Sequence, residues 1–371
     1  MASTFKAWSR TTPEAALQQV DVGAPSADEL QPTEILVETY AAALNPVDTQ
    51  LRNLSIFRLG SLAHPKGVAA DYAGVVLAVG NAVTDFKQGD EVFGMQFQAI
   101  PKPIQGALSQ IILVDVKASP TVLKPSHLSW AQAASLPLVW LTAQTCLAPP
   151  YTIKPPTDFT KSPTIVVLGG SSSVGLYAVQ IAKQTLGARV IATCSSRNAA
   201  FVRDNLGADV VVDYTSENVV DRLLELRPEE GYTAIIDCVG GIDLIPHLNA
   251  LLAARNKQLY PEGGSYTTIV GDKTDRSRLG GSTIYLWNPS MVIRHLKGWL
   301  GLGPRYACIG LTASAEYLQK AVEATKPDRP RETVVQIDSE YEFENVPKAF
   351  ERLDSGRARG KVIVRVKKDD R

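Results

Sequence analysis

The first part of the chain alternates between apolar and polar residues in short runs. Residues 34–40 and 106–114 alternate with a period of two, and residues 71–79 form a longer apolar run. This period is typical of strands that place one face on a core, and Gly89-Asp90 supplies a turn signal between two such strands. Several short strands separated by turns predict a β-rich, partly closed barrel.

The middle of the chain changes to a helical and then a mixed pattern. Residues 129–144 have helical spacing, and Pro137 is expected to break that stretch. Strands then alternate with helices, one of them at residues 243–254, and the predicted strands are residues 164–168, 188–193, 210–214, 233–237 and 266–271. Such alternation predicts a parallel sheet with helices on both faces and ligands at the carboxyl ends of its strands.

The last part of the chain returns to strand signals. Residues 333–337 and 361–366 are predicted strands on either side of a helix at residues 346–353. We expect the final strand to join the β-rich part, because it lies far from the strand–helix alternation. Before it, an amphipathic stretch is expected to place most of its apolar side chains in the core, with a substrate wall or an oligomer contact as alternatives: Trp287, Met291, Ile293, Leu296, Trp299 and Leu300.

Residues 164–187 have the order strand, small-residue turn, helix. The helix is expected to stop at Gly187. Small residues let the backbone approach a pyrophosphate, whose charge is then held by the free N–H groups of the helix start. This pattern predicts a dinucleotide site formed by Gly170, Ser171, Ser172, Ser173 and Val174. The alternative is a turn that only links a strand to a helix.

The end of the next strand indicates which dinucleotide is bound. An NAD site would carry an acid there for the ribose 2′-hydroxyl, but residues 186–203 contain neither Asp nor Glu. The strand instead runs into Ser195, Ser196 and Arg197. Two hydroxyls and a cation suit a 2′-phosphate, so we predict NADPH. The alternative is an ordinary helix start with Arg197 in solvent.

Composition and charge narrow the classes of partner. The chain has 371 residues, enough for about two domains, and 38 basic residues balance 38 acidic ones. Nucleic-acid binding is therefore not indicated, because it calls for a basic excess. No apolar run approaches the ~20 residues of a membrane span. We expect a cytoplasmic protein, with the mitochondrion as the alternative.

Cysteine and histidine spacing gives no sign of a metal centre. The cysteines lie far apart without any C-x-x-C pair, and the histidines form no local cluster. We therefore predict free thiols and no metal site. The cysteines are Cys146, Cys194, Cys238 and Cys308, and the histidines are His64, His127, His247 and His295.

Several short motifs in a fixed order resemble the medium-chain dehydrogenase/reductase superfamily over nearly the whole chain. They include Asn45-Pro46-Val47-Asp48, Asp71-Tyr72-Ala73-Gly74, Leu141-Thr142-Ala143 and Arg359-Gly360-Lys361-Val362. The match is to the zinc-independent quinone oxidoreductase and enoyl reductase branch, and it is similar to the reticulon-interacting oxidoreductases and the fungal trans-acting enoyl reductases. Asn45 and Asp71-Tyr72 stand where the zinc enzymes of the superfamily carry metal ligands.

This resemblance implies an α/β fold with a Rossmann doubly wound parallel sheet and a GroES-like β-barrel catalytic domain. The catalytic domain is expected at residues 1–137 and 312–371, and the NADPH-binding domain at residues 138–311. The resemblance also implies a homodimer paired through an edge of the nucleotide sheet. It further places Asn45, Asp48 and Thr142 at the nicotinamide and Tyr214 at the 2′-phosphate, and it adds Gly240, Gly360 and Lys361 as cofactor contacts.

The expected reaction is hydride transfer from NADPH to a quinone or an α,β-unsaturated carbonyl. Asn45 would donate a hydrogen bond and Asp48 would orient it, while Tyr72 is either a proton donor or a plain core tyrosine. A second hypothesis is a trans-acting enoyl reductase for acyl chains on a carrier protein or a synthase partner. A third is an NADPH-binding protein that has lost catalysis and serves a partner.

Overall fold

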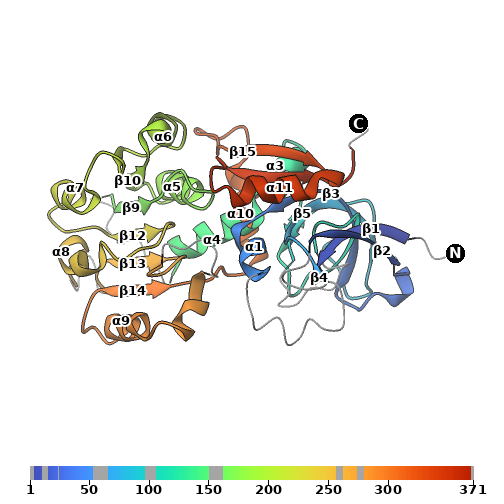
Figure 1. The fold of residues 1–371 in the computed structure, drawn as a ribbon, viewed down its shortest axis with the longest axis horizontal. Helices are drawn as coiled ribbons and strands as arrows, with labels where there is room; N and C mark the ends of the chain where they lie inside the picture. The colour runs from blue at the N-terminus through green and yellow to red at the C-terminus, as the bar shows by residue number, and fades with distance from the viewer. Residues whose placement is uncertain are drawn as a thin grey trace. The chain divides into compact units, whose positions relative to one another are not determined.

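The computed structural model describes residues 4–10, 16–23, 25–52, 66–96, 106–149, 162–255, 262–273 and 280–368. The chain divides into two compact units. The barrel unit comprises Met1–Leu141 and Ala313–Arg371, and the nucleotide unit comprises Thr142–Asp275 and Leu279–Thr312. Figure 1 shows the strands and helices of each unit.

The barrel unit is built on a seven-stranded sheet. Its order is β15-β16-β3-β5-β6-β8, with β7 paired to β3, and every pair except β15-β16 is antiparallel. A smaller sheet has the order β2-β1-β4. The strands are β1 (Thr4–Arg10), β2 (Gln18–Gly23), β3 (Glu34–Leu44), β4 (Lys66–Gly67), β5 (Asp71–Val79), β6 (Glu91–Met95), β7 (Ile111–Asp115), β8 (Thr121–Leu123), β15 (Ile337–Glu342) and β16 (Lys361–Arg365).

The C-terminal strand joins the barrel, as predicted. β16 pairs antiparallel with β3, and Val362 lies opposite Leu44. Helix α11 (Val346–Asp354) packs on β15 and β16, and helix α3 (Trp130–Ser135) packs on β3 and β5. Helices α1 (Pro46–Arg52) and α10 (Ala315–Ala324) belong to the same unit, and the boundary between the two units falls within α4 (Pro137–Leu147). The predicted break at Pro137 is confirmed, since α3 ends at Ser135 and α4 begins at the proline.

The nucleotide unit contains a six-stranded parallel sheet in the order β11-β10-β9-β12-β13-β14. This is the strand order of a Rossmann fold, so the predicted α/β class is confirmed. Figure 1 shows β10, β9, β12, β13 and β14 in succession, coloured from green to orange. The strands are β9 (Thr164–Leu168), β10 (Arg189–Cys194), β11 (Val210–Asp213), β12 (Ala234–Asp237), β13 (Ser265–Thr268) and β14 (Arg305–Cys308).

Helices separate these parallel strands because a parallel connection must cross over the sheet. Helix α5 packs on β9 and β10, and all five residues of β9 are buried. The helices are α5 (Gly175–Gln184), α6 (Ser196–Ala200), α7 (Val219–Leu226), α8 (Leu248–Leu251) and α9 (Pro289–Trp299). None of the helices in the described part of the chain has the length and apolar composition that a bilayer span needs.

Several details of the sequence-based fold were wrong or missing, and strands β2, β4 and β8 were not predicted. The strand predicted at residues 333–337 lies at Ile337–Glu342, and the helix predicted at residues 243–254 is a short 3-10 turn followed by α8. Strand β14 was not predicted. Most apolar residues of the stretch expected in the core are exposed: Met291 is buried, but Trp287 and Trp299 are 80% and 77% exposed.

Candidate functional site

The turn after β9 is held in a shape that admits no side chains at its key positions. Gly169 has a positive φ of 78°, and a Cβ on Gly175 would lie 2.1 Å from the carbonyl oxygen of Gly169. Thr193 of β10 accepts from the amide of Gly169 through its hydroxyl, at 2.9 Å, and from the amide of Gly170 through its carbonyl, at 2.8 Å. The neighbouring strand therefore fixes the turn, and sequence reasoning missed Thr193.

The start of α5 can receive an anion. The hydroxyl of Ser172 accepts from the amide of Gly175, the first residue of the helix, at 3.1 Å. Within the described residues, the amides of Ser171 and Val174 have no acceptor in the protein. Free N–H groups at a helix start bind phosphate, so this turn fits the pyrophosphate of a dinucleotide.

The end of β10 is linked to the same turn by Asn198. Its side-chain amide donates to the hydroxyl of Ser171 at 3.1 Å and of Ser195 at 3.5 Å. Ser196 and Arg197 are exposed and begin α6. The structure thus brings Ser171 and Ser195 together and leaves the Arg197 guanidinium in solvent, where it could meet a phosphate. Asn198 gave no sequence signal, because asparagine near a helix start is usually only a cap.

The adjacent strand, β11, ends in an acidic residue, Asp213. Asp213 pairs in register with Cys194, and its carboxylate accepts from the Thr215 hydroxyl at 2.6 Å and the Ser216 hydroxyl at 3.1 Å. The bond from Thr215 is the main cause that lowers the pKa of Asp213. The exposed Tyr214 follows it. The carboxylate is therefore engaged by its own loop.

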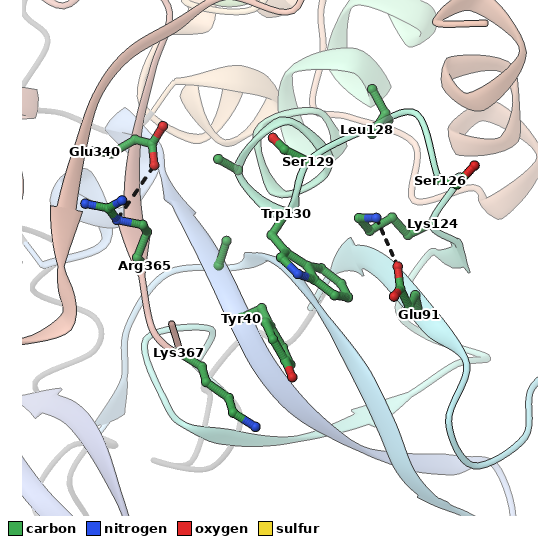
Figure 2. Close-up of a pocket in the computed structure, with 12 residues that line it drawn as sticks. Tyr40, Glu91, Lys124, Ser126, Leu128, Ser129, Trp130, Glu340, Arg365 and Lys367 are labelled. Carbon is green, nitrogen blue, oxygen red and sulfur yellow. Dashed lines mark hydrogen bonds and ion pairs between the residues drawn. The ribbon is translucent and has the colours of Figure 1, made fainter. Parts of the chain in front are cut away.

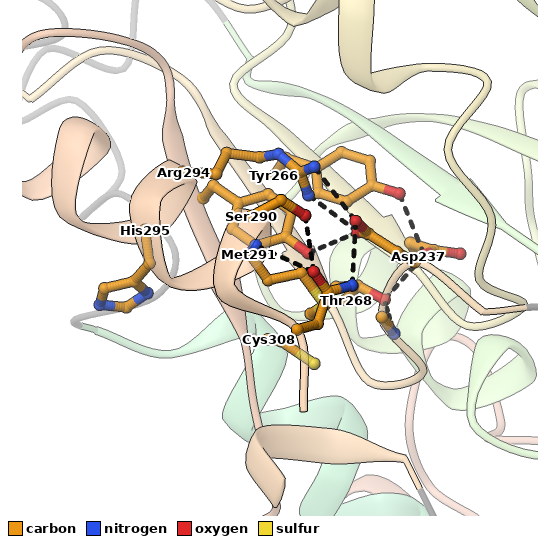
Figure 3. Close-up of polar contacts among 12 residues, drawn as sticks. Asp237, Tyr266, Thr268, Ser290, Met291, Arg294, His295 and Cys308 are labelled. Atoms are coloured by element: carbon orange, nitrogen blue, oxygen red, sulfur yellow. Dashed lines mark hydrogen bonds and ion pairs between the residues drawn. The ribbon is translucent and has the colours of Figure 1, made fainter. Parts of the chain in front are cut away.

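Asp237 organises the carboxyl end of β12. One of its oxygens accepts from the amides of Val239 and Gly240, at 3.0 and 2.8 Å. The other accepts from the hydroxyls of Tyr266 and Thr268, at 3.0 and 2.7 Å (Figure 3). Burial raises the pKa of Asp237, and these four donors oppose the rise. The bonds fix the turn that carries Gly240, whose φ is 83°.

A second acid extends this network toward α9. Asp272 accepts from Arg294 through both carboxylate oxygens, at 2.8 and 3.1 Å, and from the hydroxyl of Tyr306 at 3.2 Å. Tyr306 stacks on Tyr266 at a centroid distance of 5.6 Å. Figure 3 shows Arg294 directed toward these contacts and His295 of the same helix directed away. These hydrogen bonds connect the strands near the carboxyl edge of the sheet, where a ligand is expected.

A separate buried cluster lies inside the barrel unit. The side-chain amide of Asn45 donates to Asp71 Oδ2 at 2.8 Å, and the Lys361 ammonium donates to the same oxygen at 3.2 Å and to Asn45 Oδ1. Asp48 accepts from the backbone amide of Asn45 at 2.7 Å. The pairing of three strands brings these residues together. Ala43 of β3 pairs with Asp71 of β5. Strand β16, which begins at Lys361, pairs with the other side of β3.

Burial controls the protonation of this cluster. Removal from water raises the pKa of Asp48 to about 7, against the bond from the Asn45 amide, with Asp71 adding to the rise and Lys361 and Arg10 opposing it. Burial also raises the pKa of Asp71, and the Lys361 ammonium is the first group that opposes it. Asp48 is therefore the group of this cluster that changes charge near neutral pH.

Asp48→Asn is expected to change how stability depends on pH. The folded state of the native chain binds the Asp48 proton more tightly than the unfolded state does, so the contribution of Asp48 to stability is lost as pH rises from 3.8 to about 7. The variant lacks this loss and should gain up to about 4 kcal/mol relative to the native chain across that window. Urea unfolding of both proteins at about pH 5 and about pH 8 measures it. An equal difference at both values would contradict it.

Tyr72 does not join this cluster. It is fully buried, and its hydroxyl lies 2.8 Å from the hydroxyl of Thr121. Neighbouring residues of a strand point to opposite faces, so Tyr72 faces away from Asp71, and burial raises its pKa. These features favour the core tyrosine over the proton donor. Thr142 is buried in α4, and Gly360 begins the turn before β16 with a φ of 104°.

The barrel unit also has an open groove of about 540 Å³. Tyr40 and Trp130 line it and stack at a centroid distance of 4.5 Å, and the ammonium groups of Lys367 and Lys124 lie over their rings (Figure 2). Lys124 pairs with Glu91 at 3.0 Å. Both lysines are paired with acids, because Lys367 also contacts Glu38. The charges that line the groove are therefore already compensated within the protein. The groove is lined by other residues than those predicted for catalysis.

The described residues offer groups that fit NADPH. The glycine turn, Asn198, Ser195 and Arg197 provide amides, hydroxyls and a cation at the carboxyl ends of β9 and β10. In the described part of the chain, no group of three or more His, Cys, Asp or Glu side chains is placed to hold a metal. The four cysteines are free and buried.

Two family models match the chain. The alcohol dehydrogenase GroES-like domain matches residues 31–118, and the zinc-binding dehydrogenase family matches residues 206–364. The mouse (Mus musculus) NAD(P)H oxidoreductase RTN4IP1, mitochondrial, is 32% identical over 90% of this chain and 82% of its own length. The Arabidopsis thaliana NADPH-dependent alkenal/one oxidoreductase, chloroplastic, is 31% identical over 91% and 73%.

One further relative and two solved structures are also similar to the chain. The Solanum lycopersicum 2-methylene-furan-3-one reductase is 30% identical over 98% of this chain and 79% of its own length. The Coxiella burnetii quinone oxidoreductase has a TM-score of 0.73, with 25% identity over 98% of this chain and 100% of its own. The Escherichia coli quinone oxidoreductase complexed with NADPH has a TM-score of 0.71, with the same identity and coverage.

Proposed function

The chain belongs to the medium-chain dehydrogenase/reductase superfamily, and we propose that it is an NADPH-dependent, zinc-independent reductase of quinones or α,β-unsaturated carbonyls. The observation that carries the proposal is the turn after β9, joined by Asn198 to a β10 end that bears Ser195 and Arg197. The relatives named as alkenal and furanone reductases, and the quinone oxidoreductases among the solved structures, support the substrate class.

The proposed reaction needs little from the protein beyond binding and hydrogen bonding. NADPH, when bound, supplies a hydride from its nicotinamide. An enone that receives it at the β-carbon becomes an enolate, whose oxygen needs a hydrogen-bond donor. The resemblance implies that role for the side-chain amide of Asn45, which is fully buried, donates to Asp71 and is anchored by Asp48 through its backbone. An amide cannot release a proton at neutral pH, so water supplies the proton that completes the product.

The charge of the buried cluster supports zinc independence. The Lys361 ammonium already lies at hydrogen-bond distance from both Asn45 and Asp71. A divalent cation beside these side chains would meet a buried positive charge at short range, which is strongly unfavourable in a low-dielectric interior. The charge of Lys361 therefore disfavours a divalent cation at this cluster.

Arg197→Ala is expected to weaken NADPH binding by about 10- to 100-fold and to leave NADH binding within about twofold, because one charge-assisted contact to a phosphate contributes about 1.5–3 kcal/mol. Fluorescence titration with each dinucleotide measures both constants. Arg203→Ala is the matched control, since Arg203 is an exposed arginine paired with Asp204. If Arg197→Ala leaves both constants unchanged, the 2′-phosphate is held elsewhere.

The proposed activity is tested by NADPH consumption with quinones, small enones and an enoyl thioester, each repeated with NADH. Turnover of quinones or enones with a preference for NADPH is the expected result. A dominant rate on the thioester would favour the trans-acting enoyl reductase, and tight NADPH binding without turnover would favour the partner protein. The exposure of Trp287 and Trp299 gives no support to an acyl groove walled by them.

We also propose a homodimer formed along β14, with the cytoplasm as its compartment. β14 is the last strand of its sheet in the described residues, and apolar side chains beside it are exposed, among them Ile293, Leu296 and Trp299. A charge placed among them should separate the subunits. Trp299→Glu is therefore expected to sediment as a monomer and the native chain as a dimer. A monomeric native chain would rule this proposal out.

A further inference from the structure

We propose that Asn198 is a positioning residue that leaves the hydroxyl hydrogens of Ser171 and Ser195 free for the phosphates of a dinucleotide, and that it thereby contributes to the preference for NADPH. The inference rests on the proposed NADPH-dependent function and assigns a role to a residue that the sequence did not indicate. Ser171 lies in the turn after β9, and Ser195 directly follows β10. Asn198 joins these two places, because its side-chain amide donates to the Ser171 hydroxyl at 3.1 Å and to the Ser195 hydroxyl at 3.5 Å.

The direction of these two hydrogen bonds decides what the hydroxyls can offer to a ligand. A serine hydroxyl has one hydrogen to donate and two lone pairs to accept with, whereas the side-chain nitrogen of asparagine only donates. Because Asn198 Nδ2 is the donor in both contacts, neither serine hydrogen points at it. Within the described residues, neither hydroxyl has a protein acceptor for its hydrogen. Both hydrogens are therefore available to phosphate oxygens, which form charge-assisted bonds with such donors.

The opposite orientation of the Asn198 amide would work against a phosphate. With the amide oxygen toward the serines, both hydroxyls would donate to Asn198 and would present only lone pairs to an anion. In the observed orientation, Ser171 offers its hydroxyl hydrogen beside a backbone N–H that also has no acceptor within the described residues. Two donors on one residue next to the start of α5 suit an anionic ligand.

A helix cap does not explain Asn198. The capping position of α6 is occupied by Ser195, so Asn198 lies inside the helix, where asparagine is an unfavourable residue. A capping asparagine accepts from backbone amides, as Asn218 does from Val220 and Asp221 at the start of α7. The Asn198 side chain instead donates to two other side chains, one of them 27 positions away. Its contacts therefore serve the two serines.

The arrangement lies at the protein surface, where a ligand in solution can approach it. Ser171 is partly exposed, Ser195 and Asn198 are 9% and 8% exposed, and the neighbouring Ser196 and Arg197 are exposed. The amide of Asn198 is therefore largely shielded from water, which would otherwise compete for its two bonds. The backbone holds it in place, since the Asn198 N–H donates to the Ser195 carbonyl at 2.8 Å.

A mutational cycle tests whether Asn198 acts through the two hydroxyls. Asn198→Ala should weaken NADPH binding by about tenfold, because two hydroxyls lose the orientation that charge-assisted bonds need. NADH binding should weaken by only about threefold, because NADH lacks a 2′-phosphate to meet Ser195. In a Ser171→Ala/Ser195→Ala background, Asn198→Ala should change NADPH affinity by less than about twofold, since no hydroxyl is left to orient. Fluorescence titration with both dinucleotides measures the native chain and the three variants.

Asn218→Ala is the matched control, because it removes an asparagine at a helix start of the same unit and should leave both affinities unchanged. The inference is overturned by an unchanged NADPH affinity in Asn198→Ala, by a further loss in the triple variant, or by an equal loss in Asn218→Ala. A native chain that binds neither dinucleotide would overturn it as well. A native chain that binds NADPH but reduces none of the acceptors would refute only the proposed activity.

Asn198→Asp keeps the test decisive if Asn198→Ala fails to fold. A carboxylate has the shape of the amide but only accepts, so both serine hydroxyls would donate to it instead of to a phosphate. NADPH binding should then be weaker by at least about tenfold than in Asn218→Asp, which adds the same charge elsewhere in the unit. Equal NADPH affinities of these two variants would overturn the inference.

Discussion

Gly175→Ala is expected to remove tight NADPH binding and to lower the free energy of unfolding by about 3–5 kcal/mol, in the range of severe backbone clashes. The added Cβ would lie 2.1 Å from the carbonyl oxygen of Gly169, a backbone atom that cannot move aside like a flexible side chain. Relief of the clash must shift the turn or the start of α5. Either shift displaces the amides of Ser171 and Val174 that fit the pyrophosphate.

Gly187→Ala is the matched control for this variant. Gly187 follows the same helix, has a φ of 59°, and meets nothing within 4 Å of an added Cβ. Its replacement should cost about 1–2 kcal/mol for the left-handed backbone and leave NADPH affinity unchanged. Urea unfolding and cofactor fluorescence measure both variants. Equal NADPH affinities of the native chain and Gly175→Ala would show that this turn does not hold the dinucleotide.

Asp237→Ala is expected to lower the free energy of unfolding by about 3–5 kcal/mol, because it leaves buried donors without an acceptor. The amides of Val239 and Gly240 and the hydroxyls of Tyr266 and Thr268 all depend on this carboxylate. NADPH affinity should fall as well, since the turn that carries Gly240 loses its anchor.

Asp237→Asn should be milder, with a loss of about 1–2 kcal/mol. The amide keeps the shape and one acceptor, and the two hydroxyls can reverse their bonds. Asp204→Ala is the surface control and should leave stability almost unchanged, because its ion pair with Arg203 is exposed. Urea unfolding measures the free energy of unfolding of the three variants, Asp237→Ala, Asp237→Asn and Asp204→Ala. A loss below about 1 kcal/mol for Asp237→Ala would mean that water replaces the carboxylate.

Local signals in the sequence predicted the nucleotide unit well. The strand, small-residue turn and helix at residues 164–187 correspond to β9, the turn and α5, and the last strand joined the barrel as expected. These features depend on residues close in the chain or on one clear change of pattern. The missed strand β14 has only four residues, Arg305–Cys308, too short for a period to stand out.

Long-range contacts account for most of what the sequence could not predict. Asn45 and Lys361 are 316 positions apart, and only the register of β3 with β16 shows that they touch. Hydrophobic spacing identified Met291 and Trp299 as one apolar helix face, but it cannot say whether a helix face is covered. Asn198 was missed for a similar reason, because its partner Ser171 lies on a different strand–helix turn.

Transfer of deuterium from labelled NADPH tests the central claim most directly. The two epimers of NADPH deuterated at C4 of the nicotinamide are each incubated with the chain and a small enone. We expect one epimer to place a single deuterium at the β-carbon of the product and the other to place none, because a bound cofactor presents one face. A reduced product without deuterium from either epimer, or no reduced product, would contradict hydride transfer from NADPH.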